Sequence, residues 1–130
     1  MKGYKDNIEK SSIANENFRQ VEYTAPYSQV VLMSLKPGED IGDEVHGTDQ
    51  FFRFEAGQGK LLIDDHEYEV ADGDAAVVPA GAKHNVVNTG SEALKLYTIY
   101  CPPHHRHDVV HATKDQALAD EEEFDGHTSE

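Results

Sequence analysis

Apolar and polar residues alternate in short runs from Val21 onward. The runs are rich in β-branched and aromatic residues, and Gly, Pro, Asn and Asp separate them at brief intervals. This pattern predicts an all-β sandwich or barrel and argues against βαβ units. The expected strands are Val21–Tyr23, Ser28–Leu35, Glu44–His46, Gln50–Glu55, Lys60–Ile63, Glu67–Val70, Ala75–Val78, His84–Asn88 and Ala93–Cys101.

The one helix that the pattern predicts lies near the C-terminal end. Thr113 and Gln116 have the N-cap and N3 spacing of a capping box, and we expect the helix to end near Phe124. Residues 1–20 lack periodicity and are expected to form a loosely held arm, residues 21–112 a barrel, and residues 113–130 the helix and a solvated, partly disordered acidic tail.

Charge narrows the range of partners. The 130 residues include 25 Asp and Glu against 11 Lys and Arg, a formal net charge of −14, which argues against a nucleic-acid partner. No apolar run approaches the ~20 residues of a membrane span, and the N-terminal residues lack the apolar stretch of a signal peptide. We therefore expect no membrane association and a cytoplasmic location. The single cysteine, Cys101, excludes an internal disulfide.

Candidate metal ligands occur at strand spacing. Glu44 and His46 are two residues apart and would project from the same face of a strand. Gln50 opens the next strand after a tight turn, and His84 begins another strand after the Pro79–Gly81 turn. Glu44, His46 and His84 would form a set of two imidazoles and one carboxylate, with Gln50 as a weaker fourth ligand.

At these positions the chain resembles the cupin superfamily. The first motif of the family, G-x5-H-x-H-x3,4-E-x6-G, corresponds here to Gly38, Glu44, His46, Gln50 and Gly57. The second, G-x5-P-x-G-x2-H-x3-N, corresponds to Gly73, Pro79, Gly81, His84 and Asn88. The resemblance implies a small double-stranded β-helical barrel, a jelly roll, with a metal inside.

Two ligand positions depart from the family pattern. Glu44 replaces the first His and Gln50 replaces the Glu, so the ligand set keeps one negative charge. The family implies one divalent first-row ion, with Fe or Mn favoured and Zn or Ni as further candidates. The alternative interpretation is a hydrogen-bonded polar cluster that holds no ion.

A second group of histidines follows Pro102 and Pro103, which direct the chain out of the sheet. If this segment folds over the barrel mouth, His104, His105 or His111 could contact a substrate or act as a general base. A solvated connector with incidental histidines is the other interpretation, so the catalytic residues stay unassigned.

These features predict a metal-dependent enzyme, of isomerase or dioxygenase type, that acts on a small polar organic molecule. The alternative is a non-catalytic small-molecule or sugar-binding module or sensor. Small cupins of this kind resemble the mannose-6-phosphate-isomerase-like group, although Lys83 is the only obvious cation beside a ligand position to hold a phosphate. We also expect a homodimer, because small cupins resemble one another in pairing through sheet edges and Val21–Tyr23 and Ser28–Leu35 could serve as edges.

Overall fold

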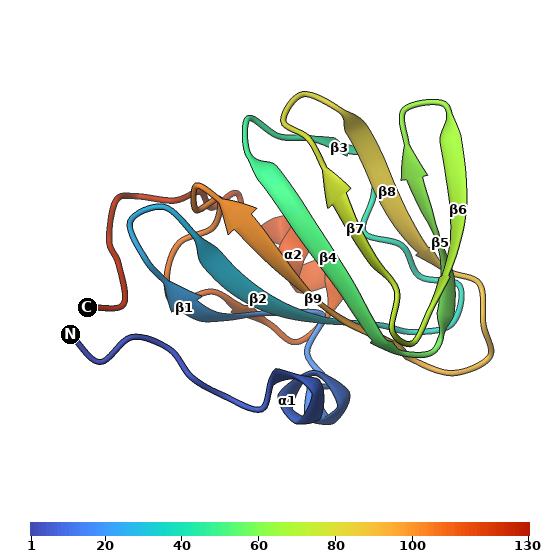
Figure 1. The fold of residues 1–130 in the computed structure, drawn as a ribbon, viewed down its shortest axis with the longest axis horizontal. Coiled ribbons are helices and arrows are strands. Elements are labelled where there is room, and N and C mark those ends of the chain that lie inside the picture. The colour runs from blue at the N-terminus through green and yellow to red at the C-terminus, as the bar shows by residue number, and fades with distance from the viewer.

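The computed structural model describes all residues from Met1 to Glu130 and contains two antiparallel sheets facing each other (Figure 1). One sheet has the strand order β10-β1-β2-β9-β4-β7 and the other the order β3-β8-β5-β6. Both the jelly-roll architecture and the short helix near the C-terminus were predicted from the sequence. The strands are β1 (Arg19–Thr24), β2 (Gln29–Leu35), β3 (Glu44–Val45), β4 (Asp49–Ala56), β5 (Gln58–Ile63), β6 (His66–Ala71), β7 (Ala75–Val78), β8 (Lys83–Asn88), β9 (Leu94–Cys101) and β10 (Val110–His111).

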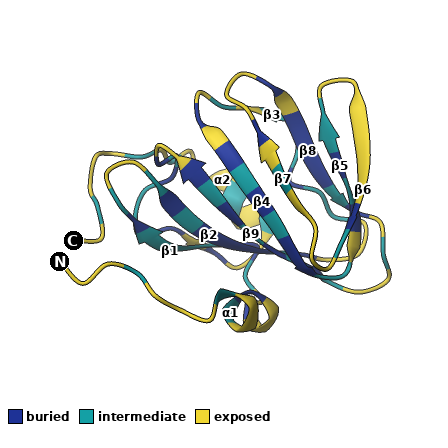
Figure 2. Ribbon diagram, in the orientation of Figure 1, coloured by how far each residue is buried: buried dark blue, intermediate teal, exposed yellow.

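Alternation along the strands sends apolar side chains into the space between the sheets. In β9 the inward residues are Leu94, Leu96, Thr98 and Tyr100, each at most 1% exposed, and Phe52 from β4 packs among them. Figure 2 shows this alternation as dark and lighter bands along the strands. The apolar core therefore ends in a polar layer, at Thr98 and Tyr100, in the part of the barrel where the candidate ligands lie.

Both ends of the chain are more ordered than the sequence predicts. Helix α1 (Ile8–Ala14) forms within the expected arm, and Asn7 caps it by accepting a hydrogen bond from the Lys10 N–H. Helix α2 (Lys114–Ala119) begins after Thr113 as predicted but ends at Ala119, well before Phe124. Neither helix is long and apolar enough to cross a membrane.

Of the two runs expected to be sheet edges, Ser28–Leu35 lies inside its sheet, while Val21–Tyr23 lies next to a strand that pairs only with Arg19 and Gln20. Strand β2 lies between β1 and β9, and β1 is covered by β10, a short strand that the hydrophobic pattern does not reveal. Two-residue strands carry too little alternation to be recognised. The homodimer stays a prediction, but Ser28–Leu35 does not provide its edge.

Candidate metal centre

The sheet register brings Glu44, His46 and His84 together. Glu44 pairs directly with His84 across β3 and β8, and His46 follows just beyond the end of β3. One ligand atom from each residue lies within 4.8 Å of the others. His46 Nε2 and Glu44 Oε2 are 2.7 Å apart, so this cluster already has the size of a site for one ion.

His84 provides the test of whether a metal ion fits. Its Nδ1 lies 3.2 Å from the Ala82 carbonyl oxygen, to which an Nδ1–H can donate. Its Nε2 is buried and has no hydrogen-bond partner. A buried polar atom without a partner is costly, and an imidazole whose other nitrogen is bonded to a carbonyl is oriented to bind a metal. The residues therefore fit a divalent ion better than a self-contained polar cluster.

Burial and charge favour the ligand forms of these side chains. Burial lowers the pKa of His84 and keeps its imidazole neutral at physiological pH. Burial alone would raise the pKa of Glu44, but the hydrogen bond with His46 and the charge of Arg19 help to lower it overall. A neutral imidazole and an ionised carboxylate are the forms that bind a metal ion.

Gln50 is buried beside this centre. Its Nε2 donates to the Thr98 hydroxyl at 2.9 Å, and its Oε1 is buried without a partner. The amide is thus held so that its oxygen, the atom able to bind a hard ion, stays free. This agrees with the optional fourth ligand that the spacing predicts.

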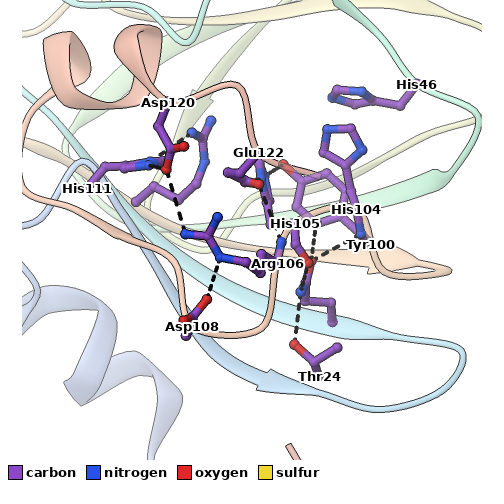
Figure 3. Close-up of polar contacts among 12 residues, drawn as sticks. Thr24, His46, Tyr100, His104, His105, Arg106, Asp108, His111, Asp120 and Glu122 are labelled. Atoms are coloured by element: carbon purple, nitrogen blue, oxygen red, sulfur yellow. Dashed lines mark hydrogen bonds and ion pairs between the residues drawn. The ribbon is translucent and has the colours of Figure 1, made fainter. Parts of the chain in front are cut away.

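The segment after β9 folds against the barrel and is not a solvated connector. The ring centroid of His104 lies 4.0 Å from that of His46, and His105 is 5% exposed (Figure 3). His111 is also buried, but it contacts Asp120 at 3.0 Å and Arg19 at 3.4 Å instead of the cluster. Among the three candidates, His104 therefore lies beside the metal centre, His105 one layer behind it, and His111 further away.

Gln29 holds this segment in place. Its side chain is fully buried, and its Oε1 accepts from the backbone N–H groups of His104 and His105 at 3.1 and 2.9 Å. Its Nε2 donates to the His105 carbonyl at 2.8 Å and to the Thr24 hydroxyl. A single amide thus satisfies three backbone groups of a segment that has no sheet partner.

Glu122 overturns the expectation of a solvated tail. Its side chain is 3% exposed, and its Oε1 lies 2.5 Å from His105 Nδ1. The backbone N–H of Phe124 donates to the His104 carbonyl, which fixes the tail over the histidines. Sequence composition alone does not separate this one buried acid from its exposed acidic neighbours.

Tyr100 is the other residue that the sequence analysis missed. Its alternation with Leu96 and Thr98 was the available signal, since all three face inward, whereas Tyr97 and Ile99 face the other way and are less buried. Burial raises the pKa of the Tyr100 hydroxyl well above its ordinary value.

We expect the metal-free protein to lose stability as the pH falls from about 6.5 to about 4. Burial, with a smaller contribution from neighbouring His105 and His46, lowers the pKa of His104 from 6.5 to about 4. In this window the unfolded chain binds a proton that the folded protein does not, so the free energy of unfolding decreases with falling pH. Because His104 is partly exposed, its contribution should be about 2 kcal/mol. Urea unfolding of the wild type and His104→Gln at several pH values would measure it; equal slopes for both proteins would contradict this assignment.

Comparison with known proteins places the fold and the cluster in a family. Residues 31–100, more than half of the chain, match the model of the Cupin domain. The chain belongs to the cupin family. This match contains the cluster residues Glu44, His46 and His84 as well as Gln50.

Two relatives of this cupin extend the match beyond the domain. It is 47% identical over 123 residues to the uncharacterized protein YrkC of Bacillus subtilis, covering 89% of this chain and 66% of YrkC. The chain thus spans about two thirds of the length of that relative. The crystal structure of BH2720 from Bacillus halodurans is 44% identical with a TM-score of 0.90, covering 92% of this chain and 96% of BH2720.

A more distant solved structure agrees in fold. The protein TT1209 from Thermus thermophilus is 26% identical with a TM-score of 0.63, covering 76% of this chain and 96% of TT1209. The names of these three relatives state no activity, so the function must be inferred from the site itself.

Proposed function

We propose that this cupin is a metal-dependent enzyme acting on a small polar organic molecule, with Glu44, His46 and His84 as the ligands of one divalent ion. The free, buried Nε2 of His84 within 4.8 Å of its two neighbours is the observation that supports this most directly. Fe²⁺ and Mn²⁺ are the favoured ions, and Zn²⁺ or Ni²⁺ would also suit imidazole and carboxylate. When bound, such an ion would polarise an oxygen of the substrate as a Lewis acid.

Groups beside the cluster favour an enzyme over a binding module. A sensor needs only ligands and a pocket, whereas an enzyme needs acid or base groups near the bound substrate. The ring of His104 packs against that of His46 at a tilt of 48°, and the ring centroid of Tyr100 lies 5.9 Å from that of His46. Both side chains can exchange protons, and both rings lie against that of the ligand His46.

A sugar phosphate is not the favoured substrate. Lys83 is exposed and its Nζ is 3.5 Å from a carboxylate oxygen of Asp43, so its charge is already partnered. A surface pocket of about 720 Å³ borders His84 and is lined by four carboxylates with Lys83 as its only cation. An anionic ligand would be repelled there, and a neutral hydroxylated or carbonyl compound fits this charge better.

Metal analysis of the purified protein tests this proposal. We expect about one ion per chain after addition of Mn²⁺ or Fe²⁺, measured by elemental analysis after dialysis. Affinity should weaken as the pH falls, because protons compete with the ion for the imidazole ligands. A protein that purifies without metal and takes up none of the four ions would exclude the proposed site.

The choice between enzyme and sensor needs a separate measurement. We expect the metal-loaded protein to convert at least one member of a panel of small diols, hydroxy ketones, diketones and keto acids, followed by NMR and with a dioxygen electrode. Saturable binding of a panel member without any turnover would favour the sensor.

A further inference from the structure

A chain of three hydrogen-bonded side chains leads from the acidic tail to the metal centre. Glu122 Oε1 lies 2.5 Å from His105 Nδ1, and His105 Nε2 lies 3.2 Å from the Tyr100 hydroxyl (Figure 3). Glu122 is 3% exposed at its side chain, His105 5% and Tyr100 1%. Burying an acid, an imidazole and a phenol in one row is expensive unless each group is paired, so this row is a built feature of the protein.

The protonation states in this row follow from its partners. The hydrogen bonds from His105 and from the Arg106 N–H, with the charge of Arg19, outweigh burial and lower the pKa of Glu122, so its carboxylate only accepts. His105 Nδ1 must therefore carry the proton of that bond. Burial lowers the pKa of His105, so the ring is neutral and its Nε2 accepts from the Tyr100 hydroxyl.

Tyr100 occupies the end of the row nearest the metal centre. It pairs directly with Gln50 across β9 and β4, and paired residues of neighbouring strands project from the same face. Gln50 is the optional fourth ligand, and the ring of Tyr100 also packs against His46 and His104. A small molecule held by an ion at Glu44, His46 and His84 would thus lie next to the Tyr100 hydroxyl.

We propose that Tyr100 is a catalytic residue that exchanges a proton with the substrate, and that His105 and Glu122 are positioning residues that relay this proton. The inference rests on the metal-dependent function proposed above and specifies its chemistry. A C–H proton next to a substrate carbonyl would pass to the Tyr100 oxygen while the Tyr100 proton passes to His105 Nε2. The imidazolium formed is paired with the Glu122 carboxylate, and the two electrons of the C–H bond stay on the substrate.

These two coupled proton transfers are compatible with the burial of Tyr100. A phenolate in this apolar layer would be strongly disfavoured, but a proton that arrives as another leaves creates no charge on the ring. The arrangement corresponds to that of catalytic triads, in which a histidine activates a hydroxyl and a carboxylate orients the histidine. Reversal of the transfers at the neighbouring carbon, with the hydroxyl proton moving to the former carbonyl oxygen, would isomerise a hydroxy ketone without any oxidant or reductant.

Hydrogen exchange into hydroxyacetone tests the relay. The zinc-loaded protein should incorporate deuterium from D₂O into this hydroxy ketone, followed by mass spectrometry. Tyr100→Phe should slow the exchange by about 100-fold or more, and Glu122→Gln by about 10-fold, with zinc content unchanged. Tyr97→Phe, on the other face of the same strand, and Asp120→Asn, which changes the partner of the other buried histidine, His111, should keep the wild-type rate.

Nitrogen NMR of the histidines gives a readout that does not depend on activity. We expect His105 to show the Nδ1–H tautomer with a strongly downfield proton in the wild type and in Tyr100→Phe. Glu122→Gln should move that proton upfield, because a neutral amide replaces the carboxylate as acceptor.

The outcomes separate the relay from the metal site. Stoichiometric zinc without deuterium incorporation, or undiminished exchange in Tyr100→Phe, would overturn the relay and leave the metal site standing. A His105 proton unaffected by Glu122→Gln would exclude Glu122 as its partner. A wild-type protein that binds neither zinc nor any of Mn²⁺, Fe²⁺ and Ni²⁺ would instead refute the proposed metal-dependent function.

Discussion

Replacement of His84 by Ala is expected to abolish stoichiometric metal binding. The substitution removes the buried Nε2 that has no other partner and leaves Glu44 and His46 as the only members of the cluster. Loss of one of three protein ligands should weaken binding by at least about 100-fold, since change of a residue that merely orients a ligand already costs about 10–100-fold. Isothermal titration with Mn²⁺ would measure the change, and the matched control is His66→Ala, an exposed histidine in the β5–β6 hairpin.

Gln50→Glu complements this test in the opposite direction. The buried Oε1 of Gln50 would be replaced by a carboxylate oxygen at the same position, so the variant should hold metal at least as well as the wild type. His84→Ala with full metal content after dialysis would mean that the ion is bound elsewhere.

Gln29→Ala is expected to cause the largest loss of stability outside the apolar core. The amide of Gln29 bonds the N–H groups of His104 and His105 and the carbonyl of His105, all in a segment without a strand partner. Removing it leaves these buried backbone groups unpaired, at an expected cost of about 3 kcal/mol in the free energy of unfolding. Urea unfolding would measure it.

The control for this variant is Gln58→Ala, an exposed amide at the start of β5, which should change the free energy of unfolding by no more than about 0.5 kcal/mol. A cost for Gln29→Ala as small as that of Gln58→Ala would show that the segment after β9 does not depend on the hydrogen bonds of Gln29.

The jelly roll could be predicted because its strands and turns are marked by short stretches of neighbouring residues. Period-two alternation marks the strands, and turns such as Lys36–Gly38 and Asp72–Asp74 mark their ends. Fixed spacing also brought Glu44, His46, Gln50 and His84 to notice, and the β3–β8 register places Glu44 directly opposite His84. From Glu44 to Gln50 the short sequence distance constrains the spatial distance, whereas the approach of His84 from a distant strand was implied by the resemblance to the cupin motifs.

The surroundings of the centre depend on contacts that sequence spacing does not encode. Glu122 contacts His105 from a tail whose composition is typical of solvated chain. Gln29, which lies in β2 near the start of the barrel sequence, bonds the same segment. Such pairings depend on how the loops cross the end of the barrel. The hydrophobic periodicity of the sequence does not predict the path of a loop. The inward position of Tyr100 could have been predicted, because the alternation of β9 places it on the same face as Leu96 and Thr98.

The most direct test of the metal centre is the position of an ion in crystals grown with Mn²⁺, located by anomalous X-ray scattering. We predict one peak per chain, with Glu44, His46 and His84 each contributing a ligand atom about 2 Å from it. Gln50 Oε1 should be the nearest further protein oxygen. A strong peak at another position, or none at these three residues in protein shown to contain manganese, would contradict the metal centre proposed here.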